Sequence, residues 1–123
     1  MDLKEILKSS VEGTGEVSEA LMKTTADIVK EGTHDIGDIF GAIIDLGKEG
    51  VVDVTEGVKG VFVGVVKALE GSGKTTEEAV EEVSKKAVTA IGSTAKEGAE
   101  EVGEAARKGV EEAKKIIKEP FEK

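Results

Sequence analysis

Several side chains used in catalysis and metal binding are absent from this sequence or nearly so. The 123 residues include no cysteine, tryptophan, tyrosine, asparagine or glutamine, and only one histidine, one proline and three phenylalanines. Without cysteine the chain forms no disulfide, no thiolate zinc site and no cysteine nucleophile. With so few aromatic residues, any core has to be built from valine, isoleucine, leucine and alanine. Thin cores of this kind usually need partners.

The charge balance disfavours a role with nucleic acids. Acidic residues number 26 against 17 lysines and arginines, which gives a formal net charge of −9 at neutral pH. Phosphate backbones are bound by basic stripes with release of counterions, and no cluster of basic residues suggests such a stripe. The dominance of lysine and glutamate, without asparagine, glutamine or cysteine, also resembles the composition of thermophile proteins.

No stretch is long enough to cross a membrane as a helix. A membrane span needs roughly 20 apolar residues, whereas the most apolar stretch, residues 57–69, is interrupted by Lys59 and Lys67. The first ten residues are charged throughout and lack the apolar core of a signal peptide. We therefore expect a cytoplasmic location, with attachment to the periphery of a membrane or lipid surface as the alternative.

Apolar residues recur with an eleven-residue period in the second half of the chain. Rows of eleven from residue 76 to residue 119 place apolar side chains in columns two, five, eight and nine, as for Val88, Ile91, Val110 and Ile117. Eleven residues make about three helical turns, so each column keeps its direction and the apolar arc spans about 130°. The same phase accounts for residues 21–42. The pattern predicts amphipathic helices.

Glycines and the proline divide this pattern into elements. We expect an all-α fold, a long antiparallel helical hairpin that assembles into a four-helix or larger bundle. Its parts are a short N-terminal helix with a flexible break (1–15), a long glycine-rich apolar helix (16–70), a turn (71–75), an amphipathic eleven-residue-repeat helix (76–119) and a tail (120–123). Glycines near 47–50 predict a kink in the long helix unless a partner packs there.

The turn itself raises an alternative function. Residues 68–75, ALEGSGKT, fit the looser P-loop pattern, with Gly73, Lys74 and Thr75 in the positions that grip phosphate and Mg²⁺. A P-loop also needs a preceding strand and a downstream acidic Mg²⁺ ligand, whereas the sequence after Lys74 is charged and helical in pattern. The same letters also indicate a helix-reversing turn, with Thr75 and Glu78 as a capping box. We favour the turn and keep nucleotide binding as a remote alternative.

The single histidine raises the question of a metal site. Glu31 and His34 have the E-x-x-H spacing of di-metal carboxylate bundles, in which both side chains project into the bundle. In the eleven-residue frame, however, both fall in polar columns, opposite Ile28 and Ile36. We therefore expect both side chains to face solvent, and we expect neither a metal nor another cofactor; a metal site formed by two copies of this pair in a symmetric dimer is kept as a remote alternative.

A short motif carries a resemblance to known proteins. The triplet Lys-Glu-Gly recurs at residues 30–32, 48–50 and 96–98. In its eleven-residue amphipathic frame it resembles the repeats of group 3 late-embryogenesis-abundant proteins, synucleins, perilipins and exchangeable apolipoproteins. The resemblance covers about residues 20–119 and implies helices that form on lipid surfaces or upon drying, without enzymatic activity. Two features depart from it: the triplet at 48–50 falls in another column, and the chain is acidic where synuclein-like repeats are flanked by lysines.

The width of the apolar arc predicts self-association. Two helices cannot cover such arcs on each other alone, so a stripe would stay exposed on the monomer. We therefore expect a non-enzymatic structural or interaction module that forms a homo-oligomer, and we expect Val61→Asp to dissociate it. The expected self-association face comprises Ile36, Ile39, Phe40, Ile43, Val51, Val54, Val58, Val61, Phe62, Val80, Val83, Ile91, Val102, Ile116 and Ile117. The close-packing glycines are expected to be Gly37, Gly41, Gly60 and Gly64.

Lipid is the alternative occupant of this stripe. A membrane, lipid droplet or similar apolar surface would bury the same apolar residues as a protein partner. In that case residues 36–69 would insert and the C-terminal helix would lie on the interface.

Overall fold

The protein is built from helices alone in the part that the structure describes. The computed structural model describes residues 2–13, 15–96 and 100–118, and these residues contain no strand. The helices are α1 (Leu3–Val11), α2 (Val17–Glu31), α3 (Ile36–Lys48), α4 (Val54–Gly71), α5 (Thr76–Lys96) and α6 (Glu100–Lys118). The all-α class predicted from the sequence is confirmed, and the helices pack as a bundle.

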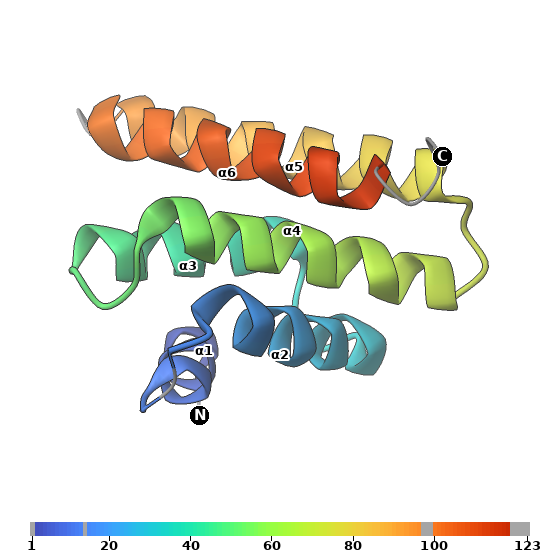
Figure 1. The fold of residues 1–123 in the computed structure, drawn as a ribbon, viewed down its shortest axis with the longest axis horizontal. Coiled ribbons are helices and arrows are strands. Elements are labelled where there is room, and N and C mark those ends of the chain that lie inside the picture. Colours follow the sequence, from blue (N-terminus) through green and yellow to red (C-terminus); the bar gives the residue numbers. More distant parts are fainter. Residues whose placement is uncertain (1, 14, 97–99, 119–123) are drawn as a thin grey trace.

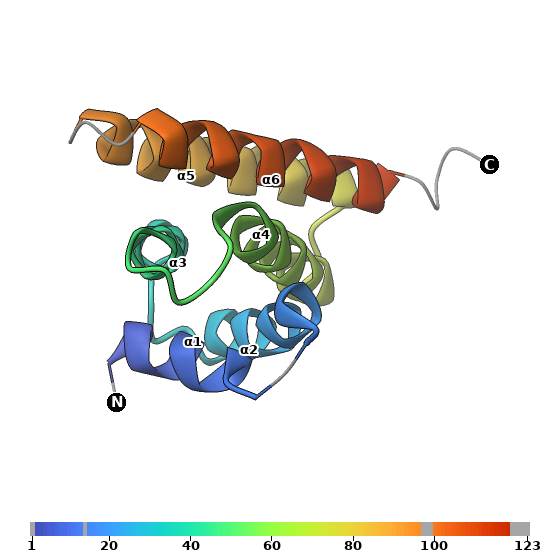
Figure 2. The same cartoon turned by 60° about the vertical axis from the view of Figure 1, so that its left-hand side comes forward.

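The helices form three layers of two. α5 and α6 make one outer layer, α3 and α4 the middle layer, and α1 and α2 the other outer layer (Figure 1). Figure 2 shows the same stacking after rotation, with α5 and α6 antiparallel and side by side. α4 packs against α2, α3, α5 and α6, most extensively against α2. The central helix of the bundle is therefore covered by helices of its own chain.

This position explains why α4 lacks the one-sided apolar pattern of residues 76–119. Its buried residues lie on nearly all sides of the helix and include Val58, Val61, Phe62, Val63 and Val65. A helix that is apolar all round is stable only where it is covered on most sides. Here that cover comes from within the chain.

The expectation of one continuous helix over residues 16–70 needs correction. The structure divides this segment into α2, α3 and α4, with linkers at residues 32–35 and 49–53. Only the second linker lies near the predicted kink at 47–50. The division lets three shorter helices pack around one another, which buries more apolar surface than one extended helix could.

Each of the two linkers is formed by a glycine that ends one helix and an aspartate that caps the next. Gly32 and Gly50 adopt the left-handed conformation, with φ of +69° and +81°, which ends a helix at little cost for glycine. Three residues later an aspartate caps the next helix: the Asp35 carboxylate accepts from the backbone N–H of Gly37, and that of Asp53 from the N–H of Glu56. The spacing Gly-x-x-Asp thus specifies both linkers.

The predicted helix over 76–119 is also divided, into α5 and α6. Residues 97–99, between these helices, and the tail at 120–123 lie outside the described residues. Both α5 and α6 pack against the middle layer. Two shorter helices can thus bury an apolar face each against it, where one long helix would extend beyond it. The eleven-residue columns do not describe these faces fully, because Val88 of column two is 64% exposed and Ile116 of column eight is 40% exposed. On α5 the buried residues are spaced by four instead: Ala79, Val83, Ala87 and Ile91.

Most residues expected on a self-association face lie inside this single chain. Four of them, Val51, Val54, Val80 and Val102, are partly buried and pack against the core, and Ile116 is exposed. The other ten are buried: Ile36, Ile39, Phe40, Ile43, Val58, Val61, Phe62, Val83, Ile91 and Ile117. The rings of Phe40 and Phe62 meet edge to face, with centroids 6.3 Å apart. The apolar stripe is the core of the monomer.

Glycine lets α4 approach its neighbours closely. A Cβ added to Gly60 would lie 2.5 Å from the carbonyl oxygen of Ser18, and one on Gly64 would lie 2.6 Å from that of Met22, so both face the backbone of α2. On the opposite side, a Cβ on Gly109 of α6 would lie 2.6 Å from the carbonyl oxygen of Thr55. The predicted close-packing role therefore fits Gly60 and Gly64.

The other predicted glycine pair does not have this role. The nearest atom to a Cβ on Gly37 is a carboxylate oxygen of its own N-cap residue, Asp35, at 3.1 Å. A Cβ on Gly41 would meet no atom of the described residues within 4 Å. Both glycines instead line an open groove between α3 and α5.

Candidate functional site

The residues of the P-loop-like string form a helix-reversing turn between α4 and α5. The backbone N–H groups of Ser72 and Lys74 donate to carbonyl groups at the end of α4. The N–H of Thr75 donates to the Glu78 carboxylate at 3.0 Å, and the N–H of Glu78 donates to the Thr75 hydroxyl at 3.1 Å. This reciprocal pair is the capping box that the sequence predicts. Gly73 has a φ of +108°, as a reversal of this kind requires.

This hydrogen bonding leaves little to hold a phosphate. A P-loop directs its backbone N–H groups at the ligand, whereas here those of residues 72–75 are taken up by α4 and by Glu78. The Lys74 ammonium is paired with the Glu82 carboxylate, and this bond raises the pKa of Lys74. Gly73, Lys74 and Thr75 lie together in the turn, but their donor groups are bound by α4 and α5 of the same chain.

The Glu31 and His34 pair is separated by the end of a helix. Glu31 is the last residue of α2 and is exposed, whereas His34 lies in the linker beyond Gly32. The i,i+3 spacing therefore does not place the two side chains on one helical face. Within residues 2–13, 15–96 and 100–118, no group of three or more His, Asp or Glu side chains is arranged to hold a metal ion.

A polar groove of about 470 Å³ lies along the contact between α3 and α5. Asp38 and Asp45 line it from α3, Asp35 from the start of that helix, and Lys86 and Thr89 from α5. Lys86 bridges to Asp35 at 3.8 Å. The three aspartates are exposed, so water solvates their charges and the groove is an ordinary solvated face of the bundle.

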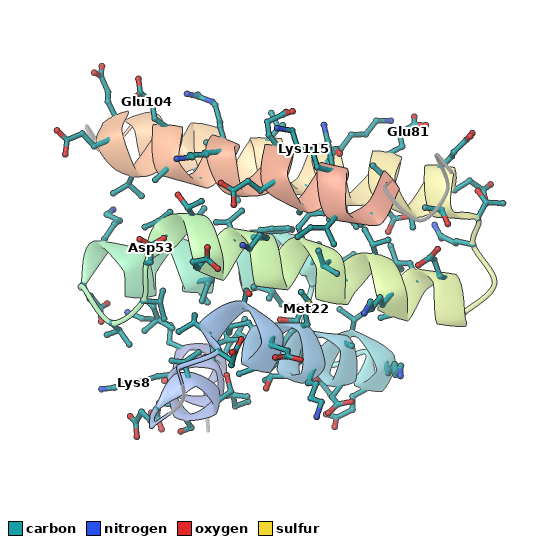
Figure 3. All side chains as sticks on the ribbon, viewed as in Figure 1. Lys8, Met22, Asp53, Glu81, Glu104 and Lys115 are labelled. Carbon is teal, nitrogen blue, oxygen red and sulfur yellow. The ribbon has the colours of Figure 1, made fainter. Side chains whose placement is uncertain are left out.

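An apolar groove runs over α4 between α2 and α6, and we call it the α2–α4–α6 groove. Its deeper hollow, of about 290 Å³, is lined by Met22, Val63, Val66, Lys67, Glu70, Ile116 and Ile117. Figure 3 shows Met22 at the boundary between α2 and α4. An adjoining hollow of about 300 Å³ shares Met22 and Lys67 and is also lined by Lys23 and Lys30. Apolar lining and a few charged groups meet here, as they do in small-molecule sites.

A second apolar hollow lies between α5 and α6, and we call it the α5–α6 groove. It measures about 270 Å³ and is lined by Val88, Ile91, Gly92, Arg107, Val110, Glu111 and Lys114. Val88 is the most exposed large apolar side chain in the described part of the protein. Charged side chains of both signs border it.

Neither groove was singled out from the sequence. Met22 and Val88 stand in apolar columns of the eleven-residue pattern, but that pattern says nothing of which side chains meet from α2, α4 and α6. One signal was present: Lys67 interrupts the most apolar stretch of the chain, and a lysine in such a place often extends its stem over apolar surface.

Two further findings bear on function. None of the helices in the described ranges combines the length and the hydropathy needed to cross a lipid bilayer. Comparisons with protein-family models, with curated protein sequences and with solved structures give no match to this chain.

Proposed function

We propose that this chain is a non-enzymatic helical interaction module that self-associates through the α5–α6 groove. The observation that carries the proposal is the 64% exposure of Val88 beside this apolar hollow. An exposed apolar side chain next to an apolar groove favours contact with another molecule. In a two-fold dimer, Val88 of each copy would enter the groove of the other.

The charges around the groove suit a second copy of the same chain. Glu81 and Lys85 of α5 form an exposed ion pair at 3.6 Å, and Arg107, Glu111 and Lys114 of α6 line the groove. A two-fold contact places the same patch on both sides, so a patch with both signs of charge can complement itself. The apolar area is small, and we therefore expect a weak, concentration-dependent dimer.

Sedimentation velocity over a range of about 5 to 500 μM tests this proposal. We expect the mean mass of the wild type to rise with concentration and that of Val88→Asp to remain monomeric. Ser9→Asp introduces the same charge at an exposed position of α1 and should behave as the wild type. A wild type that stays monomeric throughout, or a Val88→Asp variant that still associates, would refute the proposal.

Reversible binding to a lipid surface is the second candidate. Small residues supply much of the contact between the outer α5–α6 layer and the middle layer: Ala79, Ala87, Ala106, Gly109 and Ala113 are all buried. A contact between small side chains buries less apolar area than a contact between large ones. Because hydrophobic stabilisation scales with apolar area, separation of the two layers would cost correspondingly less free energy. The exposed faces could then lie on lipid.

Hydrogen exchange on neutral phosphatidylcholine vesicles tests this second candidate. Circular dichroism is a poor test, because the folded chain is already helical. Binding by opening predicts that the protein floats with the vesicles and that the amides of α4 exchange faster than in buffer. Protein that stays in the aqueous fraction would exclude lipid-surface binding.

A further inference from the structure

The α2–α4–α6 groove combines a buried apolar floor with partly exposed apolar walls. Its deeper hollow has Val63 and Val66 as an almost fully buried floor, with Met22 and Ile116 at its walls. Ile116 remains 40% exposed although the adjacent Ile117 is buried. An apolar chain that covers these walls would remove apolar surface from water, and this burial would favour binding.

Three lysines line the two hollows of this groove. Lys67 lines both hollows, and Lys23 and Lys30 line the second. Lys59, which also lies on α4, is paired with Glu56 and Glu112. In contrast, Lys23, Lys30 and Lys67 form no ion pair with any residue that the structure describes.

The acidic residues of the groove do not cancel these charges. The Glu70 carboxylate accepts a hydrogen bond from the hydroxyl of Thr76 at the start of α5. The other acidic residue of the groove is Glu19, which lines the second hollow. Three lysines against two glutamates make a locally basic patch on a chain of net charge −9. The ligand that suits this patch is an anion attached to an apolar body.

The size of the groove selects among such ligands. A helix is about 10 Å across and rises about 5.4 Å per turn, so one turn fills about 400 Å³, more than either hollow, of about 290 and 300 Å³, can hold. A methylene group is similar in size to a water molecule, which occupies about 30 Å³. The deeper hollow therefore matches a chain of about ten methylenes.

We propose that the α2–α4–α6 groove binds one free medium-chain fatty carboxylate. The alkyl chain lies along Met22, Val63 and Ile116, and the carboxylate is held by Lys67 together with Lys23 and Lys30. The bundle stays closed, so this binding differs from the spreading of opened helices on a lipid surface.

The experiment uses the full-length, ¹⁵N-labelled protein and sodium decanoate below its micelle concentration. We expect amide shifts that saturate with one ligand per chain and cluster at Met22, Lys67 and Ile116. Hexanoate should bind much more weakly, by about three- to fourfold for each methylene removed, because each buried methylene contributes to transfer from water. Shifts spread over the whole chain, shifts centred on Val88, or a response to vesicles without a response to monomeric decanoate would each overturn the proposal.

Two pairs of variants separate specific binding from general effects. Ile116→Asp should abolish decanoate binding, whereas Val88→Asp makes the same change at the other strongly exposed apolar residue and should bind as the wild type does. Lys67→Glu should weaken binding by about three- to tenfold, as expected for reversal of a solvent-exposed charge, and Lys8→Glu, on exposed α1 surface, should not. Equal affinities within either pair would contradict the assignment of the chain or of the carboxylate.

Discussion

Gly60 lies so close to Ser18 that a Cβ on the glycine would come within 2.5 Å of the Ser18 carbonyl oxygen. Backbone therefore meets backbone where α4 crosses α2, the most extensive helix contact in the bundle. A glycine inside a helix costs about 0.5 to 1 kcal/mol relative to alanine. Close packing of α2 on α4 offsets that cost.

Gly60→Ala is expected to destabilise the fold by about 2 kcal/mol, because the added methyl group forces α2 away from α4. Gly41→Ala is the matched control, since it makes the same change within a helix where the methyl group enters open space. We expect it to stabilise the protein by about 0.5 to 1 kcal/mol. Urea denaturation followed by circular dichroism measures both changes. Equal effects of the two substitutions would contradict the close contact.

The same α2–α4 contact contains a polar group without a partner. The Thr25 side chain is fully buried, and its hydroxyl oxygen has no hydrogen-bond partner among the described residues. Thr25→Val replaces the hydroxyl by a methyl group of similar size and should stabilise the protein by about 1 kcal/mol. Thr25→Ser keeps the hydroxyl and removes the methyl group, so we expect a loss of about 1 kcal/mol. Thermal denaturation should rank the variants Val, Thr, Ser, and a destabilised Thr25→Val would indicate a hidden partner.

Substitution of two valines should separate the core from the surface. Val61 is fully buried, so Val61→Asp places an unpaired charge in the core and should cost more than about 4 kcal/mol, enough to unfold many small domains. We therefore no longer expect this variant to yield a folded, dissociated subunit. Val88→Asp changes an exposed side chain and should keep a cooperative thermal transition. A well-folded Val61→Asp variant would show that the apolar stripe is not the core.

The capping box predicts a pH effect on stability. Hydrogen bonds from Thr75 lower the pKa of Glu78 below its ordinary value of 4.5. Because the folded pKa is depressed, the contribution is complete above pH 4.5 and is lost as the pH falls through the folded pKa. Glu78→Gln should therefore lose less stability than the wild type between pH 5 and pH 3, in denaturant titrations at each pH. Thr75→Ala removes the hydroxyl but keeps the backbone N–H, whose hydrogen bond to Glu78 is the larger cause of the lowered pKa, and should flatten the profile less. An unchanged acid profile in Glu78→Gln would count against the capping box.

The turn also allows a test of the nucleotide alternative. Because the N–H groups of residues 72–75 are already donated within the protein, we expect ATP with Mg²⁺ to leave the melting temperature unchanged. Lys74→Ala should behave in the same way in this respect. A wild-type melting temperature that rises with ATP, and a Lys74→Ala variant that does not respond, would restore the P-loop interpretation.

Sequence reasoning succeeds here where a signal is local. The capping box at Thr75 follows from spacing, because both of its partners lie within one helical turn. The Gly-xxx-Gly spacing predicts the close-packing pair Gly60 and Gly64 but equally Gly37 and Gly41, so spacing alone does not determine which pair meets a neighbouring backbone. The two linkers are also specified locally, by Gly32 with Asp35 and by Gly50 with Asp53. The eleven-residue pattern nevertheless predicts continuous helix, because its apolar phase continues across the first linker.

Long-range features could not be derived in this way. The apolar pattern shows that one face of each helix has to be buried. It does not say whether that face is buried by a second copy of the protein, by lipid or by another helix of the same chain. The α2–α4–α6 groove depends on how three separate helices meet, and α2 and α6 are far apart in the sequence. Val88 lies on the apolar arc by its column, yet it is exposed, because the face of α5 that packs on the middle layer carries residues spaced by four, such as Val83 and Ala87.

The most direct test of the fold described here is amide hydrogen exchange along α4 at low micromolar concentration, without lipid. If one chain covers its own central helix, the amides of residues 58–66 should be the slowest to exchange, at a rate independent of protein concentration. Rapid exchange in α4 that slows only at high concentration, or only on addition of vesicles, would show that the cover comes from outside the chain.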